Sequence, residues 1–445
     1  IKAILKHPSV TREPSIRYCK LFLREGSHDY LRETAFEGIY RFERASYLKC
    51  KIEEIFHPFK ETIYWSLRPN LSDEPYDEVK ASEYAEQYYN LLNDAVRLRL
   101  RSNVKAGSAL SGGLDSSSIS YLMNLHLNAS GFEGQMETFS STYRTPGSEY
   151  CDESFYINEV VQFLDVQSNA VEPKIEDIVE EHRKFVYHLD TPATNTLMSS
   201  WHTYRLTKER GVTIILEGQG ADEQLAGYPK YLLNYFSIAS LGTLIQELPF
   251  YIRVPNRLPY ITLAPVLNLS RRLLGESFSL AILGLIGRKF SYIPVNQSLS
   301  DDLSHSIETF FHWADCGSMA FSIESRMPFM DYRVVEFLAA VPASYKLHKG
   351  WTKFLARKAF DGKLPRNVCW RRDKKGWPIP EEFWFQGELR EHFAKTIVNS
   401  NFISECGIDL SELNERNLFK RYPFALLMRF YVLEIWHSVF WGDLP

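Results

Sequence analysis

A chain of 445 residues is long for a single hydrophobic core, which predicts two domains. Its 45% hydrophobic and 24% charged residues are typical of globular proteins and argue against a disordered chain. The net charge of −4 provides no general attraction to nucleic acid, so no nucleic-acid partner is expected. Six cysteines without a CxxC pair indicate neither a zinc site nor a disulfide framework, which favours a reducing, cytoplasmic location.

The first part of the chain is expected to be rich in β-strands. Three short runs have the composition of strands, at Ile39–Phe42, Tyr47–Cys50 and Ile63–Trp65. Residues 67–80 contain two prolines and many polar residues, and this composition predicts a linker. A first domain over residues 1–66 and a second over 81–445 follow from these boundaries.

The second domain is expected to start with a helix and to alternate between strands and helices. Apolar residues recur at helical spacing within 82–100, at Tyr84, Tyr88, Leu92 and Val96. Strand–helix alternation continues to about residue 231, and mostly helices follow. The most apolar stretches, 232–246 and 278–287, are too short to span a bilayer, so we expect buried helices and no membrane partner.

The most informative motif is residues 111–117, which read SGGLDSS between an apolar strand-like run and a helical pattern. Glycines let the backbone close around phosphate oxygens, and a helix N-terminus adds amide donors. Ser111, Ser116 and Ser117 would add hydroxyl donors. Asp115 would repel a phosphate unless a divalent cation joined the two, so the motif predicts Mg²⁺.

A second glycine-rich stretch follows a second strand. Residues 213–216, TIIL, read as a buried parallel strand and run directly into EGQGADE at 217–223. Open parallel sheets bind ligands at the carboxyl ends of their strands. Asp222 is therefore expected to face the same phosphates and the same metal as Asp115.

These motifs resemble those of a known family. SGGLDSS is similar to the pyrophosphate-binding loop of PP-loop ATP pyrophosphatases, which split ATP between its α and β phosphates. Residues 318–331, SMAFSIESRMPFMD, and 370–377, WRRDKKGW, resemble two segments of the class B, glutamine-hydrolysing asparagine synthetases. The resemblance extends from about residue 34 to 385, and the motifs occur in the same order as in the family. This family includes β-lactam synthetases and lasso-peptide cyclases.

The resemblance implies a fold for each domain. Residues 81–445 would form an α/β synthetase domain with a parallel sheet, of the adenine nucleotide α-hydrolase type. Residues 1–66 would be a truncated, β-rich remnant of an Ntn glutaminase-like domain, because TAFEGIYRF at 34–42 is similar to that domain's closing segment. Glutamine-using members begin with Cys, whereas residue 1 is Ile, so either part of that domain precedes residue 1 or another amine is used.

The resemblance also assigns roles. Asp115 and Asp222 would hold Mg²⁺ on the phosphates of ATP, and Lys374 would neutralise the leaving pyrophosphate. Glu324 and Gln219 would lie near the reacting carbonyl. The residues expected to bind ATP are Leu110, Ser111, Gly112, Gly113, Asp115, Ser116, Ser117, Ser140, Ser141 and Gly218.

The implied activity is that of a ligase that adenylates a carboxylate, releases pyrophosphate and transfers an amine to form an amide. The carboxylate would belong to a small molecule or a peptide, and the amine would be ammonia, a glutamine-derived amine or an amine of the substrate. At Gln219, asparagine synthetases usually have Glu and β-lactam synthetases Tyr; a glutamine cannot take up a proton. A cyclase that uses an intramolecular amine is therefore the alternative.

Other interpretations of these residues stay open. Lys374 and Lys375 belong to a basic run that would suit an ordinary solvated surface, and Glu324 has Arg326 and Arg333 as potential ion-pair partners. A non-catalytic scaffold would have allowed the phosphate loop to degenerate, yet the loop is complete. A homodimer is one assembly that the sequence leaves open.

Overall fold

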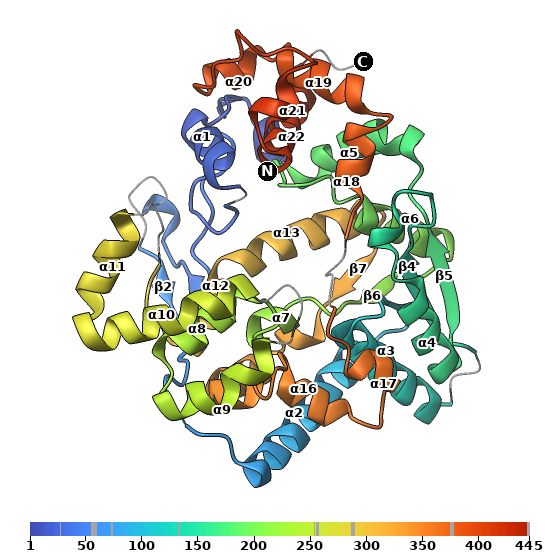
Figure 1. Ribbon diagram of the computed structural model, residues 1–445. Helices are drawn as coiled ribbons and strands as arrows, with labels where there is room; N and C mark the ends of the chain where they lie inside the picture. Colours follow the sequence, from blue (N-terminus) through green and yellow to red (C-terminus); the bar gives the residue numbers. More distant parts are fainter. Residues whose placement is uncertain are drawn as a thin grey trace.

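A computed structural model describes residues 1–26, 28–54, 60–72, 74–131, 134–252, 254, 258–285, 290–373 and 378–442 (Figure 1). Its centre is a five-stranded sheet in the order β5-β4-β3-β6-β7, in which all neighbouring strands are parallel. This confirms the predicted α/β class. The strands are β3 (Ala106–Ala109), β4 (Glu137–Ser141), β5 (Gln167–Val171), β6 (Ile214–Leu216) and β7 (Glu324–Arg326).

Helices cover both faces of the sheet, and strand β6 presents apolar side chains to both of them. In β6, Ile214 and Leu216 share a core with Leu122 of α3, whereas Ile215 packs with Tyr204 of α6. One face is covered by α2 (Glu78–Arg99), α3 (Leu114–Ala129) and α16 (Phe354–Phe360). The helices on the opposite side are α5 (Ile178–Leu189), α6 (Met198–Glu209) and α13 (Ser306–Met319).

The predicted helix at 82–100 is confirmed and begins one turn earlier, as α2. The Asp77 carboxylate caps it by accepting a hydrogen bond of 2.9 Å from the amide of Lys80. Tyr88, Leu92 and Val96 are buried in the core beneath the sheet, as their spacing predicts.

Most of the chain after β6 is helical, as expected. Between β6 and β7 lie α7 (Ala221–Gln224), α8 (Lys230–Ile238), α9 (Leu241–Ile252), α10 (Leu258–Leu274), α11 (Glu276–Leu285), α12 (Val295–Ser304) and α13. After β7 come α14 (Tyr332–Ala340), α15 (Ala343–Lys346), α17 (Arg366–Cys369), α18 (Glu381–Gln386), α19 (Arg390–Val398), α20 (Asn401–Glu405), α21 (Leu418–Arg421) and α22 (Phe424–Trp441). Helix α4 (Ser154–Leu164) joins β4 to β5.

The expectation that residues 1–66 are rich in strands is wrong for the part of this segment that is described. It contains a ten-residue helix, α1 (Ile16–Glu25), and a two-residue antiparallel ladder between β1 (Ser46–Tyr47) and β2 (Thr62–Ile63). Tyr18, Phe22 and Leu23 lie on one face of α1 at helical spacing and are buried against α22. That core, rather than a sheet, holds the N-terminal segment in place (Figure 1).

The two most apolar stretches are only partly buried, which corrects the expectation of buried helices. In α8, Leu232 and Phe236 are fully buried, but Ile245 of α9 is 76% exposed and Phe278 of α11 is 56% exposed. Among the residues that the structure describes, no helix combines the length and the apolar character needed to cross a membrane.

Candidate active site

The SGGLDSS motif forms the connection from β3 to α3 at the carboxyl edge of the sheet. Gly112 has a left-handed backbone, with φ of +72°, and a Cβ there would lie 2.7 Å from the Cβ of Tyr156 and 2.8 Å from the amide nitrogen of Ile157. Only glycine fits this position. Gly113 is the N-cap of α3, and no side chain caps the helix there. The first turn can therefore offer its amide groups to an anion.

Two of the three predicted serines shape the loop. The Ser111 amide donates to the Ser116 hydroxyl at 3.1 Å, and the two hydroxyl oxygens also lie 3.1 Å apart. Ser117 is fully buried. The structure thus brings Ser111 and Ser116 to the loop, and it places the Ser117 side chain in the protein interior.

The second glycine-rich stretch packs directly against this loop because β3 and β6 are neighbours, with Ala106 paired to Ile214. A Cβ on Gly218 would lie 2.9 Å from the amide nitrogen of Ser116 and 3.2 Å from the Cβ of Asp115. Glycine at position 218 therefore permits the close approach of the two loops.

The two predicted aspartates converge on one cation. The Lys353 ammonium contacts Asp115 Oδ2 and lies 2.7 Å from Asp222 Oδ1. The lysine is 3% exposed and the carboxylates are 15% and 13% exposed. Burial lowers the pKa of Lys353, and the Asp115 carboxylate opposes that effect. A Cβ on Gly227 would approach Lys353 Cε to 2.5 Å, so the site is tightly enclosed.

Sequence reasoning missed Lys353. It precedes α16 in a left-handed conformation, with φ of +54°, within a stretch that contains several other basic residues. No spacing singled it out. The parallel pairing of β3 with β6 brings Asp115 and Asp222 together, and the tertiary fold places the Lys353 ammonium between their carboxylates.

The two carboxylates fit the predicted metal. Mg²⁺ is commonly bound through one or two carboxylates together with substrate phosphates and water. Asp115 and Asp222 are close enough to contact one ammonium, so one cation can reach both. Within the described ranges, no group of three or more His, Cys, Asp or Glu side chains is arranged to hold a metal ion. The remaining ligands would therefore come from the nucleotide and water.

Leu110, Ser140 and Ser141, which the resemblance assigns to ATP binding, join the strand ends to the loop. Leu110 is buried, and its carbonyl accepts a hydrogen bond of 2.6 Å from the Ser140 hydroxyl. The Ser141 hydroxyl donates to the carbonyl of Ser199 in α6 at 2.7 Å. These serine hydroxyls are bonded to the main chain, so their contribution is to position β4 beside the phosphate loop.

The structure does not bring Glu324 to this site. Glu324 is the first residue of β7 and pairs with Ile214, the first residue of β6, whereas both glycine loops follow the opposite ends of their strands. Its carboxylate is 59% exposed and 2.9 Å from the Arg326 guanidinium, which lowers its pKa. The alternative partner considered from the sequence, Arg326, is therefore confirmed.

A different carboxylate lies at the carboxyl edge of β6. Glu217 is buried, and its oxygens accept hydrogen bonds from the Tyr204 hydroxyl at 2.9 and 3.1 Å and from the Ser325 hydroxyl at 2.5 Å. Burial raises the pKa of Glu217. Gln219, two residues later, is partly buried.

Lys374 and Lys375 lie outside the described residues, but the residues immediately before them are firmly held. The Arg371 guanidinium is 2.5 Å from Glu153 and 2.8 Å from Asp373, and its centre lies 3.7 Å from the ring centroid of Tyr156. Tyr156 is also the residue against which Gly112 packs. Through Tyr156, this cluster places Arg371 close to the phosphate loop.

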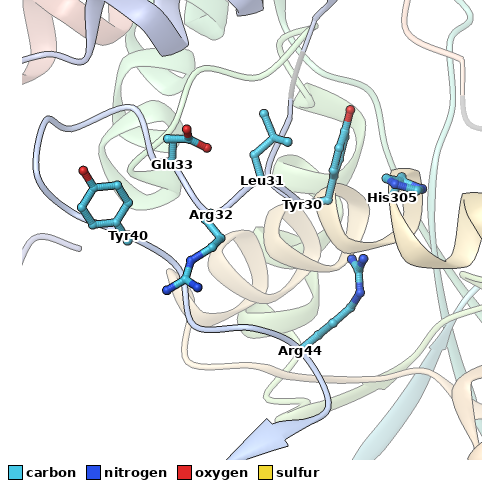
Figure 2. A pocket seen from close by; sticks show the side chains of 7 residues that line it. All are labelled: Tyr30, Leu31, Arg32, Glu33, Tyr40, Arg44 and His305. Atoms are coloured by element: carbon cyan, nitrogen blue, oxygen red, sulfur yellow. The ribbon is translucent and has the colours of Figure 1, made fainter. Parts of the chain in front are cut away.

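A separate cavity of about 500 Å³ lies between the N-terminal segment and the end of α12 (Figure 2). Arg32 and Arg44 line it, and they are ion-paired with Glu61 and Glu308, respectively. The ring of Tyr30 lies edge-on against that of His305. None of the predicted site residues lines this cavity, so it is distinct from the loop site.

The fold and the loop site together define an α/β protein with a phosphate-binding loop and a pair of converging aspartates at the carboxyl edge of a parallel sheet. The sequence pattern of the asparagine synthase family matches residues 87–430, and the chain belongs to this family. The resemblance identified from the motifs is thereby confirmed.

Individual relatives are similar at a moderate level. The chain is 25% identical to asparagine synthetase [glutamine-hydrolyzing] 1 of Bacillus subtilis, over 81% of the chain and 60% of that protein. It is 25% identical to a putative asparagine synthetase [glutamine-hydrolyzing] of Mycobacterium tuberculosis, over 92% of the chain and 65% of the relative. Amidase chry2 of Gibberella zeae is 23% identical over 86% of the chain and 65% of its own length. The chain thus spans less than two thirds of the length of these relatives.

Proposed function

We propose that this protein is an ATP-dependent ligase that adenylates a substrate carboxylate with release of pyrophosphate, after which an amine displaces AMP from the acyl-adenylate to form an amide. One observation carries the proposal: Asp115 and Asp222, from loops that follow neighbouring strands, converge on one cation beside an uncapped helix N-terminus. This arrangement suits the binding of a metal–triphosphate complex.

Adenylation requires stabilisation of the charge that develops on the α-phosphate and on the leaving pyrophosphate. Asp115 and Asp222 would hold Mg²⁺, which supplies positive charge to the phosphates when bound. The amides after Gly112 would bind phosphate oxygens. The Lys353 ammonium, already between the carboxylates, is available to a phosphate, and Lys374 is proposed to neutralise pyrophosphate.

The second half of the reaction requires a group that takes up a proton from the attacking amine. Gln219 cannot do so, and Glu324 lies at the other edge of the sheet. Glu217 is our candidate, because it follows β6 directly, next to Gly218, and because burial raises its pKa. Tyr204 and Ser325 would hold its carboxyl group in a fixed orientation.

Two substrate classes remain within this reaction. Aspartate with ammonia or a glutamine-derived amine corresponds to the names of the bacterial relatives, which are called glutamine-hydrolysing asparagine synthetases. A larger carboxylate or a peptide with its own amine corresponds to a cyclase, which Gln219 favours because it replaces the usual Glu. We place both within the asparagine-synthase-like ligases and expect ATP and Mg²⁺ as cosubstrate and cofactor.

The test is ATP–pyrophosphate exchange with Mg²⁺, measured with aspartate and with a panel of larger carboxylates and peptides. Exchange with aspartate supports the asparagine synthetase assignment, and exchange only with a larger substrate supports the cyclase. Asp115→Asn should abolish exchange while thermal unfolding stays cooperative. Loss of exchange together with loss of the folded state would instead make Asp115 a structural residue.

A second comparison tests the proposed register of the basic segment. Lys374→Ala should suppress exchange, and Lys375→Ala should have a mild effect. Equal effects would show that the register is wrong. Absence of Mg²⁺–ATP binding in calorimetry would favour a non-catalytic scaffold over any ligase.

A further inference from the structure

The chain makes a tight turn just before Lys353. His348 and Trp351 exchange both of their main-chain hydrogen bonds, at 3.1 and 2.8 Å, and we call the segment between them the clamped turn. Its central residues both have positive φ, +44° at Lys349 and +83° at Gly350, as in a type I′ turn. A lysine rarely adopts this conformation unless its surroundings hold it there. Lys353 follows Trp351 by two residues, so the position of the clamped turn determines the position of its main chain.

A buried carboxylate from α9 holds the clamped turn. Glu247 Oε1 lies 2.8 Å from His348 Nδ1, and Glu247 Oε2 accepts a hydrogen bond of 2.6 Å from the amide of Lys349. The two side chains of the first contact are 10% and 7% exposed. The His348 ring is also stacked on Tyr76, with 3.6 Å between the ring centroids. Both oxygens of Glu247 are therefore bonded to adjacent residues of one turn, which fixes its orientation as well as its position.

The main chain of α9 and that of the clamped turn are in direct contact. The Tyr251 hydroxyl donates to the Trp351 carbonyl at 3.0 Å, and a Cβ on Gly350 would lie 2.7 Å from the carbonyl oxygen of Phe250. Helix α9 belongs to the helical section between β6 and β7, away from the sheet (Figure 1). The clamped turn thus connects this section to the residue that lies between the two aspartates.

We propose that Glu247 is a positioning residue, which acts through the clamped turn to hold the Lys353 ammonium between Asp115 and Asp222. The ammonium contacts both carboxylates and is 3% exposed, so a small displacement of the turn would move it out of the loop site. A misplacement of about 1 Å can cost about 100-fold in rate. This role depends on the proposed function, in which the Lys353 ammonium is available to a phosphate.

A double-mutant cycle separates this role from a purely structural one. Glu247→Ala removes both acceptors and should lower ATP–pyrophosphate exchange at least about tenfold. In the Lys353→Met background the same substitution should cause no further loss of exchange, because the ammonium that it would misplace is absent. Glu247→Gln should recover most of the exchange, since its side-chain amide can still bond to both His348 and Lys349.

Amine labelling tests the positioning without any ligase activity. Reductive methylation of the full chain with formaldehyde and a borane reductant, read by peptide mass spectrometry, measures the access of the reagent to each lysine. Glu247→Ala should accelerate the methylation of Lys353 at least about tenfold, because the clamped turn opens locally. The methylation of Lys346 should stay unchanged, since Lys346 is 1% exposed and is held separately by Asn296 at 2.8 Å.

Glu434→Ala serves as the matched control. Glu434 is a partly buried carboxylate on α22 that accepts a hydrogen bond from the Ser400 hydroxyl, in the core formed by the C-terminal helices. Its removal should lower Tm and leave both the exchange rate and the methylation of Lys353 unchanged.

Three outcomes would overturn the role of Glu247. Loss of exchange by the same factor in both backgrounds would show that Glu247 acts independently of Lys353. Equal acceleration of methylation at Lys346 and Lys353 would show a general loss of structure, and unchanged methylation of Lys353 would show that the turn does not hold it. Absence of exchange in the wild type with every carboxylate tested would instead contradict the proposed function, and the labelling would still decide the role of Glu247.

Discussion

Replacement of Lys353 by methionine is the sharpest test of the loop site. The substitution removes the ammonium between Asp115 and Asp222 and leaves two nearly buried carboxylates facing each other. Breaking a buried ion pair costs about 3–5 kcal/mol. Unfolding entropies of about 2.1 cal/mol/K per residue give about 0.9 kcal/mol per kelvin for 445 residues, so Tm should fall by about 3–5 °C.

Mg²⁺ should reverse part of this loss. In the variant no ammonium competes for the two carboxylates, so Mg²⁺ should bind the folded state more tightly and raise its Tm more than that of the wild type. ATP–pyrophosphate exchange should nevertheless fall by about 100-fold, because a fixed positive charge is lost where phosphate charge develops. Differential scanning calorimetry with and without Mg²⁺ measures the first effect, and the exchange assay measures the second.

Lys358→Met provides the control, because Lys358 lies in α16, which begins directly after Lys353, and pairs with a largely exposed Glu78. Such a surface pair contributes about 0–1 kcal/mol, so Tm should change by less than about 1 °C. A Lys353→Met protein as stable as Lys358→Met without Mg²⁺ would contradict the predicted loss of the buried ion pair. A Tm increase with Mg²⁺ that is no larger for Lys353→Met than for the wild type would contradict the predicted metal site.

The remaining predictions concern the loop, a buried lysine and the proposed base. Gly112→Ala should abolish Mg²⁺–ATP binding in calorimetry, because the added Cβ would collide with α4. Gly131→Ala should retain binding, because Gly131 has the same φ of +72° but no atom within 4 Å of the added Cβ. Equal losses in the two variants would mean that backbone strain, and not the contact with α4, is responsible. Burial lowers the pKa of Lys346 to about 7, so between about pH 7 and 10 the unfolded state binds the proton that the folded state lacks, and stability rises with pH. In urea unfolding, Lys346→Met should reduce the rise of the unfolding free energy with pH by up to about 1.4 kcal/mol per pH unit. Lys349→Met, at an exposed position, is the control and should keep the rise. An equally steep rise in both variants would contradict the lowered pKa of Lys346. Glu217→Gln should retain ATP–pyrophosphate exchange and lose amide formation, and loss of both would remove Glu217 as the base.

The parts of the fold that sequence predicted best are those set by local pattern. The helical spacing of Tyr88, Leu92 and Val96 and the apolar run of β6 each determine an element within a few residues. The convergence of Asp115 and Asp222 was also predictable, because both follow strands of one parallel sheet and such strands present their carboxyl ends together.

The failures arose where distant segments decide the outcome. Lys353 has no local signal, since its importance depends on a return of the chain more than 200 residues after Asp115. Glu324 was misplaced because a motif gives residue order but not which end of a strand a side chain occupies, and the pairing with Ile214 places it at the amino edge. The helix α1 has local signals, the Ser15 N-cap and the helical spacing of Tyr18 and Phe22, but it was missed because the resemblance implied a β-rich domain for this segment.

The packing of α1 against α22 has a consequence for the order of folding. Phe22 shares its core with Trp436, more than 400 residues later, so these side chains meet only after residue 436 has been synthesised. Until then the apolar face of α1 is exposed, which makes it prone to aggregation and accessible to chaperones. The sheet and its phosphate loop, built from residues 106–326, can form earlier, which makes closure of the terminal core the last long-range step.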